Sequence, residues 1–415
     1  MRCLRPHRRG ATRRVGRRQQ IDANHHFGYG LAMRVADLFS GCGGMSSGFT
    51  AAGYDVVFAA EKWPRARLVY DQNFGHAASQ IDLSNVVEAV SAVARWEPEI
   101  IVGGPPCQDF SAAGLRQETS RADLTWSFAE VVRACRPAWF VMENVPEAGE
   151  SRAWRTARGR LASAGYGITE TVLDASLFGV PQLRKRRFLI GRQGEDDDFL
   201  APYLADRETE TALTVRGYLG DELGVEHYYR HPRHWGRRAI YSIDEPSATV
   251  RSTNRPIGPG YSSHPLDSAP IDGVKPLNSK QRARIQTFDS GFVFDDRLHA
   301  WEIDLMVANA VPVKLVENVA RAISAYSDAK AGRPQEKEFR RWLQEKHGYT
   351  ERAAGNVASR LKRARRMLPA AAFVDVRDEI HALQKSEEFS PLSVSVRSQL
   401  KRALQLHSEF SGFGQ

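Results

Sequence analysis

Short apolar segments alternate with helix-compatible segments from residue 34 to about residue 192, and this alternation constrains the fold more than any other feature of the chain. The predicted strands lie at 34–39, 55–60, 99–102, 138–142 and 187–191. The helix-compatible segments lie at 44–52, 65–73, 84–95, 123–135 and 152–164. This alternation predicts an α/β fold in which helices cover a mostly parallel sheet. In such sheets, ligands bind outside the carboxyl ends of the strands.

The rest of the 415 residues divides into segments of different character. Aromatic residues, arginine, proline and glycine increase at 199–275, which predicts a small loop-rich domain. Helical patterning returns at 277–288 and 306–326, so we expect the chain to rejoin the first domain. The expected organisation is a leader at 1–32, a first domain at 33–198, the loop-rich domain at 199–275, a return at 276–328 and a charged helical extension at 329–415. The leader lacks hydrophobic periodicity, which is typical of disorder. We expect it to be an extension upstream of the true start at Met33 rather than at Met1, with a DNA-binding arm or a transit peptide as the alternatives.

Basic residues are concentrated in parts of the chain rather than spread along it. The net charge is +9, and residues 1–20 alone hold eight arginines and no acidic residue. Residues 227–284 hold ten Lys/Arg against four Asp/Glu, and residues 328–415 hold 17 against 11. Such a distribution is typical of a protein that grips phosphates on one surface, although solvated charge without a partner gives the same pattern.

The cysteines indicate a reducing compartment. Cys3, Cys42, Cys107 and Cys135 lie far apart, without paired spacing or a nearby histidine cluster, so we expect neither disulfides nor a metal site. No apolar run reaches membrane-spanning length, and no signal-peptide pattern is present. These observations predict a cytoplasmic protein without a membrane partner.

A glycine-rich turn follows the first predicted strand and opens a helix. Glycines at 41, 43 and 44 let backbone amides approach a ligand closely at that helix start. The next strand ends at Glu61, where a carboxylate can accept both hydroxyls of a ribose. Trp63 can pack on adenine and Asp82 can accept from its exocyclic amine, so the set favours an adenosine ligand, although Trp63 taken alone also fits a core position.

Cys107 follows the stiff turn at 103–106 directly after a predicted strand. Two glycines permit a tight turn and two prolines fix it, which holds the thiol at the carboxyl edge of the sheet. Glu143 ends a separate strand at the same edge. A thiol nucleophile and a carboxylic acid facing one pocket suit attack on an electron-poor ring.

Four consecutive basic residues, 184–187, follow Gln182 and Leu183. With a strand period of two, Gln182, Arg184 and Arg186 share one face. Arginines at alternate positions near a nucleophile suit phosphate and carbonyl recognition, and a charged edge strand that blocks aggregation is the alternative.

Together these segments resemble the DNA (cytosine-5) methyltransferase family of bacterial restriction-modification type. Residues 37–44 resemble its cofactor turn, 104–111 its nucleophile loop, 143–145 its acid strand, 182–186 its arginine strand, and 279–288 and 309–312 its last two motifs. Their order agrees with that of the family over residues 34–325. One departure is Ala308 before Asn309, where the family commonly has glycine, and we expect a small local shift there.

The resemblance implies a Rossmann-like class I methyltransferase domain that binds S-adenosylmethionine, beside a small target-recognition domain. It implies catalytic roles for Cys107, Glu143, Arg184 and Arg186. It implies a cofactor site made of Phe39, Ser40, Gly41, Cys42, Gly43, Gly44, Glu61, Lys62, Trp63, Asp82, Pro105, Leu124 and Asn309.

The implied reaction takes place on a cytosine rotated out of double-stranded DNA. The Cys107 thiolate adds to carbon 6, Glu143 stabilises the ring at N3, and carbon 5 takes the methyl group before the thiolate leaves. For DNA contacts we expect Gln182 and the stretch that holds Arg251, Arg255 and His264, with either base reading or phosphate positioning as their role.

A monomer and a cognate restriction endonuclease acting on the same site are the expected assembly and partner. An RNA cytosine-5 methyltransferase and a DNA-binding regulator without catalysis remain the alternatives.

Overall fold

A six-stranded sheet forms the centre of the molecule in the computed structural model, which describes residues 32–106, 122–368 and 375–411. The strands, in spatial order, are β2 (Asp55–Ala60), β1 (Arg34–Leu38), β3 (Ile100–Gly103), β4 (Trp139–Asn144), β7 (Lys185–Gln193) and β5 (Tyr166–Asp174). The first four pair in parallel, and β7 runs antiparallel to both of its neighbours. This confirms the predicted α/β fold with a mostly parallel sheet.

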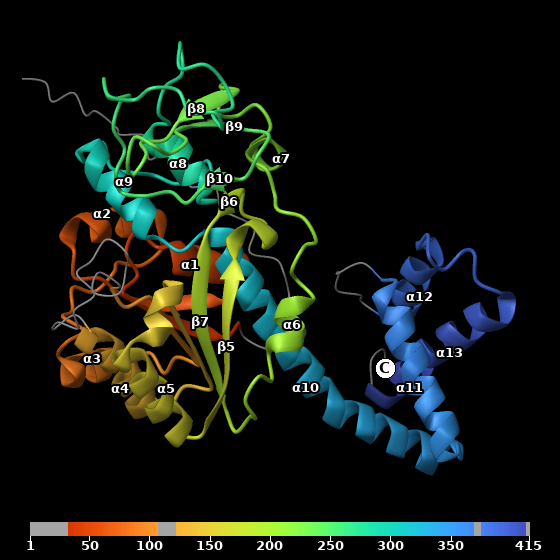
Figure 1. The fold of residues 1–415 in the computed structure, drawn as a ribbon. Coiled ribbons are helices and arrows are strands. Elements are labelled where there is room, and N and C mark those ends of the chain that lie inside the picture. Colours follow the sequence, from red (N-terminus) through yellow and green to blue (C-terminus); the bar gives the residue numbers. More distant parts are fainter. Residues whose placement is uncertain (1–31, 107–121, 369–374, 412–415) are drawn as a thin grey trace, which may run out of the picture.

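Two features of the sheet differ from the sequence prediction. β5 was not predicted, because Thr169, Glu170 and Thr171 interrupt its apolar pattern. β7 was predicted as a strand but not as an antiparallel one, since direction cannot be read from apolar content. β5 and β7 together close one edge of the sheet (Figure 1).

Helices cover both faces of the sheet. On one face α1 (Gly44–Ala51), α6 (Ala201–Ala205) and the first part of α10 (Val313–His347) share a core with the strands. On the other face lie α3 (Val86–Ala94), α4 (Ala122–Cys135) and α5 (Arg152–Ser163). Short 3-10 turns follow β4 at Pro146–Glu150 and β5 at Ala175–Leu177. α1 and α10 approach so closely that a Cβ on Gly48 would lie 2.5 Å from Val316. That approach holds the glycine-rich turn of α1 beside the chain that returns at residue 310.

A loop-rich module sits above the carboxyl edge of the sheet (Figure 1, green and cyan). It contains α7 (Val215–Leu219), β8 (His227–Tyr229), β9 (Ile240–Ser242) and β10 (Ser247–Ala248). β10 pairs in parallel with β6 (Gln182–Leu183), and α8 (Ser279–Ile285), α9 (Ala300–Asn309) and α2 (Pro64–Asn73) complete its core. A buried ion pair of 2.6 Å between Arg282 and Asp304 joins α8 to α9. The module therefore packs on the first domain through β6 and α2.

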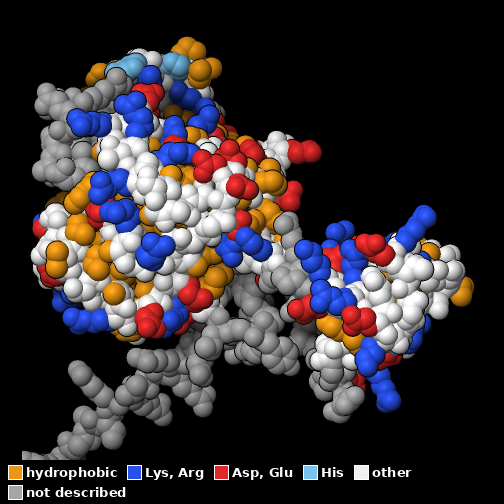
Figure 2. Space-filling view, turned by 90° about the horizontal axis from the view of Figure 1, so that it is seen from below, with side chains coloured by type: hydrophobic (Ala, Val, Ile, Leu, Met, Phe, Trp, Pro, Cys, Tyr) orange, Lys and Arg blue, Asp and Glu red, His pale blue; other side chains and the backbone are white. Residues whose placement is uncertain are grey.

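The chain leaves this body along α10 and ends in a separate helical module (Figure 1, blue). This module consists of the second part of α10 with α11 (Glu351–Arg366), α12 (Val376–Lys385) and α13 (Val394–Ser411). Its core holds Phe339, Leu343, Leu361, Leu383 and Leu404 and includes no residue of the sheet. Figure 2 shows it as a separate lobe beside the main body, with Lys and Arg side chains at several places on the visible face. Over the described ranges, no helix is long and apolar enough to cross a bilayer.

Candidate active site

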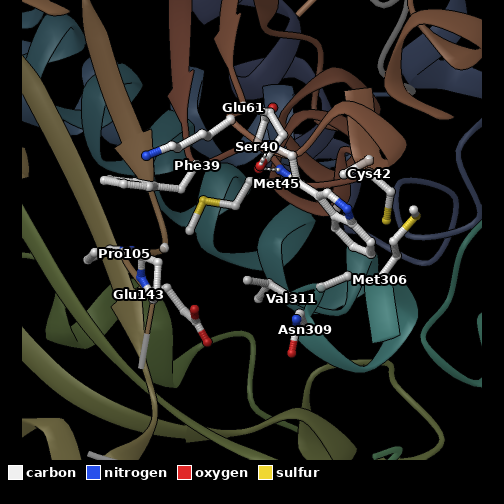
Figure 3. Close-up of a pocket in the computed structure, with 18 of the residues that line it drawn as sticks. Phe39, Ser40, Cys42, Met45, Glu61, Pro105, Glu143, Met306, Asn309 and Val311 are labelled. Carbon is white, nitrogen blue, oxygen red and sulfur yellow. Dashed lines mark hydrogen bonds between the residues drawn. The ribbon is translucent and has the colours of Figure 1, made fainter. Parts of the chain in front are cut away.

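A cavity of about 340 Å³ opens at the carboxyl ends of β1, β2, β3 and β4. Its walls bring together residues from positions as far apart in the sequence as 39 and 311. Figure 3 shows Glu61 toward one end of this pocket and Glu143 and Asn309 toward the other, with Met45 between them. The predicted residues that line it are Phe39, Ser40, Gly41, Cys42, Gly44, Glu61, Lys62, Trp63, Asp82, Pro105, Leu124, Glu143, Arg184, Arg186 and Asn309.

The glycine-rich turn after β1 has a backbone that few residues adopt. Gly41 and Gly43 have φ values of 57° and 101°, and Phe39 has φ 63° although it carries a side chain. A non-glycine residue with positive φ costs free energy, and such residues cluster at ligand sites. Gly43 does not line the cavity, in contrast to its prediction, because its α-carbon faces the ring of Phe74, 2.3 Å from where a Cβ would stand.

Glu61 holds the two strand ends in register at the pocket. Its carboxylate accepts hydrogen bonds from the backbone N–H of Gly41 at 2.8 Å and of Trp63 at 2.7 Å. Burial raises the pKa of Glu61, and these backbone donors oppose that rise. These bonds leave part of the carboxylate's acceptor capacity for ligand hydroxyls.

Lys62 and Asp82 form a more exposed ion pair on the same side of the pocket. The ammonium of Lys62 lies 2.6 Å from the Asp82 carboxylate. This hydrogen bond, helped by those from Ser84, lowers the pKa of Asp82 to about 2. Asp82 is therefore ionised at neutral pH and available as an acceptor at the pocket rim.

Asp37 supports the turn from below and was not predicted as a functional residue. Its carboxylate is fully buried and accepts from the backbone N–H of Ser46 at 3.1 Å and from the Ser46 hydroxyl at 2.6 Å. Burial raises the pKa of Asp37 to about 7. The available sequence signal was an acidic residue within an otherwise apolar strand, directly before the glycine-rich turn.

Glu143 ends β4 at the opposite end of the pocket. Its carboxylate pairs with the Arg186 guanidinium at 2.9 Å, and it is buried. Burial raises the pKa of Glu143, while Arg186 and Arg184 hold it down. A carboxyl group with a raised pKa inside a pocket can donate a proton or a short hydrogen bond to a ligand.

The start of the loop that carries Cys107 is fixed beside Glu143. Asn144 donates from its amide to the carbonyl of Pro105 at 3.1 Å, and Pro106 also lines the cavity. A Cβ on Gly104 would lie 3.1 Å from a Glu143 carboxylate oxygen. Cys107 itself lies outside the described residues, so the chain is placed up to the position immediately before it.

Arg184 joins the first domain to the returning chain. It is 2 % exposed and donates to the carbonyls of Ala308 at 2.8 Å and Ala310 at 3.1 Å. It also donates to the carbonyl of Val250 at 3.3 Å, which belongs to the loop-rich module. Through these three hydrogen bonds Arg184 positions the pocket wall. Its positive charge also lowers the pKa of Glu143.

The predicted DNA contact of Gln182 is corrected by the structure. Gln182 is fully buried, donates to the Gln286 side chain at 2.9 Å and accepts from the backbone N–H of Val250 at 2.9 Å. The strand alternation that places Arg184 inside the molecule places Gln182 there too. These hydrogen bonds connect β6 to the loop-rich module.

The three remaining predicted DNA contacts differ in accessibility. Arg251 is half-buried and donates to the carbonyl of His231. His264 is also half-buried, and its ring accepts from the backbone N–H of Leu266 at 3.1 Å. Arg255 is exposed, and no hydrogen bond or ion pair with the described part of the chain engages it.

Sequence reasoning missed several pocket residues. Met45, Ile81, Leu83, Met306 and Val311 supply apolar wall. Each lies within three residues of a predicted site residue, but an apolar side chain in a helix or loop carries no sign that it faces a ligand rather than a core.

Known proteins resemble this chain in sequence. The model of the C-5 cytosine-specific DNA methylase family matches residues 33–325. The type II methyltransferase M.HindV of Haemophilus influenzae is 46 % identical over 294 residues, covering 70 % of this chain and 96 % of that protein. M.HgiDI of Herpetosiphon aurantiacus is 47 % identical over 295 residues, covering 71 % and 95 %.

Solved structures share the fold. Dnmt2 methyltransferase of S. pombe superposes with a TM-score of 0.56 at 18 % identity, covering 71 % of this chain and 99 % of that one. A putative DNA modification methyltransferase from an E. coli prophage superposes with a TM-score of 0.53 at 21 % identity, covering 72 % and 100 %.

Proposed function

Because this chain belongs to the C-5 cytosine-specific DNA methylase family and is a DNA cytosine-5 methyltransferase, we propose that its pocket binds S-adenosylmethionine and a flipped-out cytosine side by side. The observation that carries the proposal is that the glycine-rich turn, Glu61 and Glu143 line one continuous cavity. The adenosine half would occupy the end with Glu61, and the cytosine would enter beside Glu143.

The residues at the first end fit S-adenosylmethionine. Glu61 offers free lone pairs to two ribose hydroxyls, and Phe39 and Trp63 offer aromatic faces to an adenine. Asp82 is an ionised acceptor for the exocyclic amine. Asn309, exposed at the end of α9, would contact the methionine part. When bound, the cofactor supplies an electrophilic methyl group on its sulfonium.

Cys107 would act as the nucleophile on the cytosine. Its thiolate would form a bond to carbon 6, and the electron pair of the 5,6 double bond would move to carbon 5. Carbon 5 would then bond to the methyl group as the bond between that methyl and the sulfonium sulfur breaks, with its electron pair staying on sulfur. A base then removes the proton from carbon 5, the double bond re-forms, and the thiolate leaves. Pro105 and Pro106 support this role, because they bring the chain to the cavity wall immediately before Cys107.

Glu143 would stabilise the ring when the thiolate adds. Addition places negative charge toward N3, and a carboxyl group with a raised pKa can donate there. Arg186 orients the carboxyl group through their 2.9 Å contact. Arg184 fixes the wall formed by residues 308–310 and adds positive charge that favours a thiolate in this region.

Recognition of the DNA sequence would fall to the loop-rich module around residues 199–275. Arg255 is its best candidate among the predicted contacts, because its guanidinium is exposed and unengaged within the described residues. Base reading and phosphate positioning both suit an arginine there. We further propose that the substrate is duplex DNA, that the enzyme acts as a cytoplasmic monomer, and that a cognate restriction endonuclease shares its site.

The decisive experiment traps the covalent step. Bisulfite sequencing of DNA from cells that express the chain first gives the methylated site. A duplex with 5-fluorocytosine at that site cannot lose a proton from carbon 5, so a denaturation-resistant protein–DNA adduct should accumulate when cofactor is added. Cys107→Ala should abolish the adduct, and Cys135→Ala should retain it. An adduct that survives Cys107→Ala would refute the assignment, and a regulator without catalysis would form none.

A further inference from the structure

The helical module beyond residue 334 lies outside the 33–325 range that the family model matches. One of its surfaces, which we call the α11 face, consists of the exposed residues Arg352, Asn356, Ser359, Arg363 and Arg366. Their spacing of four and three residues places them in one stripe along the helix. The stripe is about 21 Å long at 1.5 Å per residue.

The opposite side of α11 is used for packing. Ala354, Val357, Ala358, Leu361 and Ala364 are buried against α10 and α13. The helix cannot turn its arginines inward without removing these residues from the core. The module therefore presents the α11 face outward in a fixed orientation.

The turn between α10 and α11 also fixes that orientation. Gly348 ends α10 with φ 66°, and the hydroxyl of Thr350 accepts from the backbone N–H of Ala353 at 3.3 Å to begin α11. A glycine at a helix end and a threonine cap at the next start are strong local signals, so this connection is short and defined.

Neighbouring acids do not neutralise the α11 face. The helix carries six Lys/Arg and one acidic residue, Glu351. Glu336 pairs with Lys362 at 2.5 Å, and Glu379 pairs with Arg365 at 3.6 Å. Both of these basic residues flank the stripe. Arg352, Arg363 and Arg366 form no ion pair with the described residues, so three guanidinium groups on one stripe remain available to a polyanion.

We propose that the α11 face is a second DNA-binding surface, which contacts the phosphate backbone next to the methylated site. Charge complementarity favours DNA, because phosphates accept bidentate hydrogen bonds from arginines at this spacing, and the enzyme already binds DNA as its substrate. Asn356 and Ser359, between the arginines, are further donors to phosphate oxygens. The module would hold the flanking duplex while the pocket acts on the cytosine.

The proposal goes beyond the methyl-transfer reaction, and it is tested by DNA binding on the full chain. The variant is Arg363→Ala/Arg366→Ala, which keeps helix propensity and removes two exposed charges. The matched control is Arg377→Ala/Lys385→Ala, which removes two exposed charges from α12 of the same module. Binding is measured against salt concentration on a duplex of about 60 base pairs and on one trimmed to the methylated site.

On the long duplex, the α11 variant should bind roughly tenfold more weakly at about 0.1 M salt, with a slope of log K against log salt reduced by about 1.8 for two lost phosphate contacts. On the trimmed duplex, the α11 variant, the control and the unchanged protein should bind alike. Turnover at saturating DNA should stay unchanged, which separates this result from failure of the proposed reaction, where the unchanged protein would transfer no methyl group.

Equal affinities and slopes for the α11 variant and the unchanged protein on the long duplex would overturn the proposal. Loss of binding to a separate acidic protein, such as a partner endonuclease, with unchanged DNA affinity would overturn it in favour of a protein partner. An equal loss in the control variant would also overturn it, since the effect would then reflect net charge rather than the α11 face.

Discussion

The first domain with its loop-rich module, together called the body, and the C-terminal helical module assemble their candidate sites in opposite ways. In the body, the pocket takes residues from β1, β2, β3, β4 and the return after α9, so its chemistry depends on long-range folding. In the module, α11 to α13 follow one another and pack on the end of α10, and its candidate surface lies on a single helix. The first site therefore forms only when segments distant in the sequence come together, whereas the second depends on the spacing of residues along one helix.

The largest contrast is expected from matched carboxyl substitutions. Glu143→Gln should reduce turnover by about 100- to 10,000-fold, the range for loss of a general acid. Glu379→Gln in the module should leave turnover at saturating DNA unchanged. Glu379 is a matched control because it is also partly buried, it also lies beside an arginine, and burial also raises its pKa. Single-turnover methyl transfer measures both, and equal losses would mean that burial of a carboxyl group, not its place in the pocket, explains the effect.

A glycine substitution in the sheet should cost the body much of its stability. A Cβ on Gly191 would lie 2.0 Å from the ring of Phe140, the residue opposite it in β4. Because Phe140 is fully buried and cannot move into solvent, Gly191→Ala should destabilise the fold by about 1–3 kcal/mol or more. Urea unfolding measures the difference, and an unchanged midpoint would show that β4 and β7 can separate more easily than their packing indicates.

Asp37 should make the stability of the body depend on pH. Its pKa is raised to about 7 in the folded state, so its contribution is full below about 4 and is lost as pH rises toward and through 7. Asp37→Asn has no titratable group at this position. Between pH 5 and pH 8 its free energy of unfolding should therefore fall less than that of the unchanged protein, with a difference of a few kcal/mol at most. Parallel stability curves for the two proteins would contradict the assignment.

The smallest effect is expected from the same glycine-to-alanine change in the module. Gly355 lies inside α11, and a Cβ there would meet only the Arg340 side chain at an ordinary 3.5 Å. Gly355→Ala should stabilise the module by about 0.4–1 kcal/mol, because alanine loses less backbone entropy in a helix. A rise in the thermal midpoint of the module's transition measures it. A fall would mean that the contact with Arg340 is tighter than its distance indicates.

The parts of the fold that the sequence could predict are those with local signals. The strand that ends at Leu38 and the helix that begins at Gly44 were found from an apolar run followed by glycines. β5 was missed because its polar residues mask its period, and the antiparallel direction of β7 depends on long-range pairing. Within the site, Glu61 and Glu143 could be identified because each stands at the end of a predicted strand. Both lie at the pocket because the carboxyl ends of parallel strands meet at one edge of the sheet.

The roles of buried polar residues could not be predicted in the same way. Gln182 and Arg184 share a strand face in the sequence pattern, but only the packing of β6 under the loop-rich module shows that the face is internal. Arg251 belongs to a basic loop and binds a backbone carbonyl instead of standing in solvent. A side chain's partner is set by tertiary contacts that no local spacing encodes.

One helix passes through both hydrophobic cores, with Tyr326 packed in the first and Phe339 in the second. Because α10 is continuous, its helical geometry fixes how the module is rotated around the α10 axis. Each residue inserted between these two positions would advance the module by about 1.5 Å and rotate it by about 100°. Seven inserted residues nearly restore the original direction of the α11 face, whereas two turn it to the opposite side. Affinity for the long duplex should therefore vary periodically with the number of inserted residues.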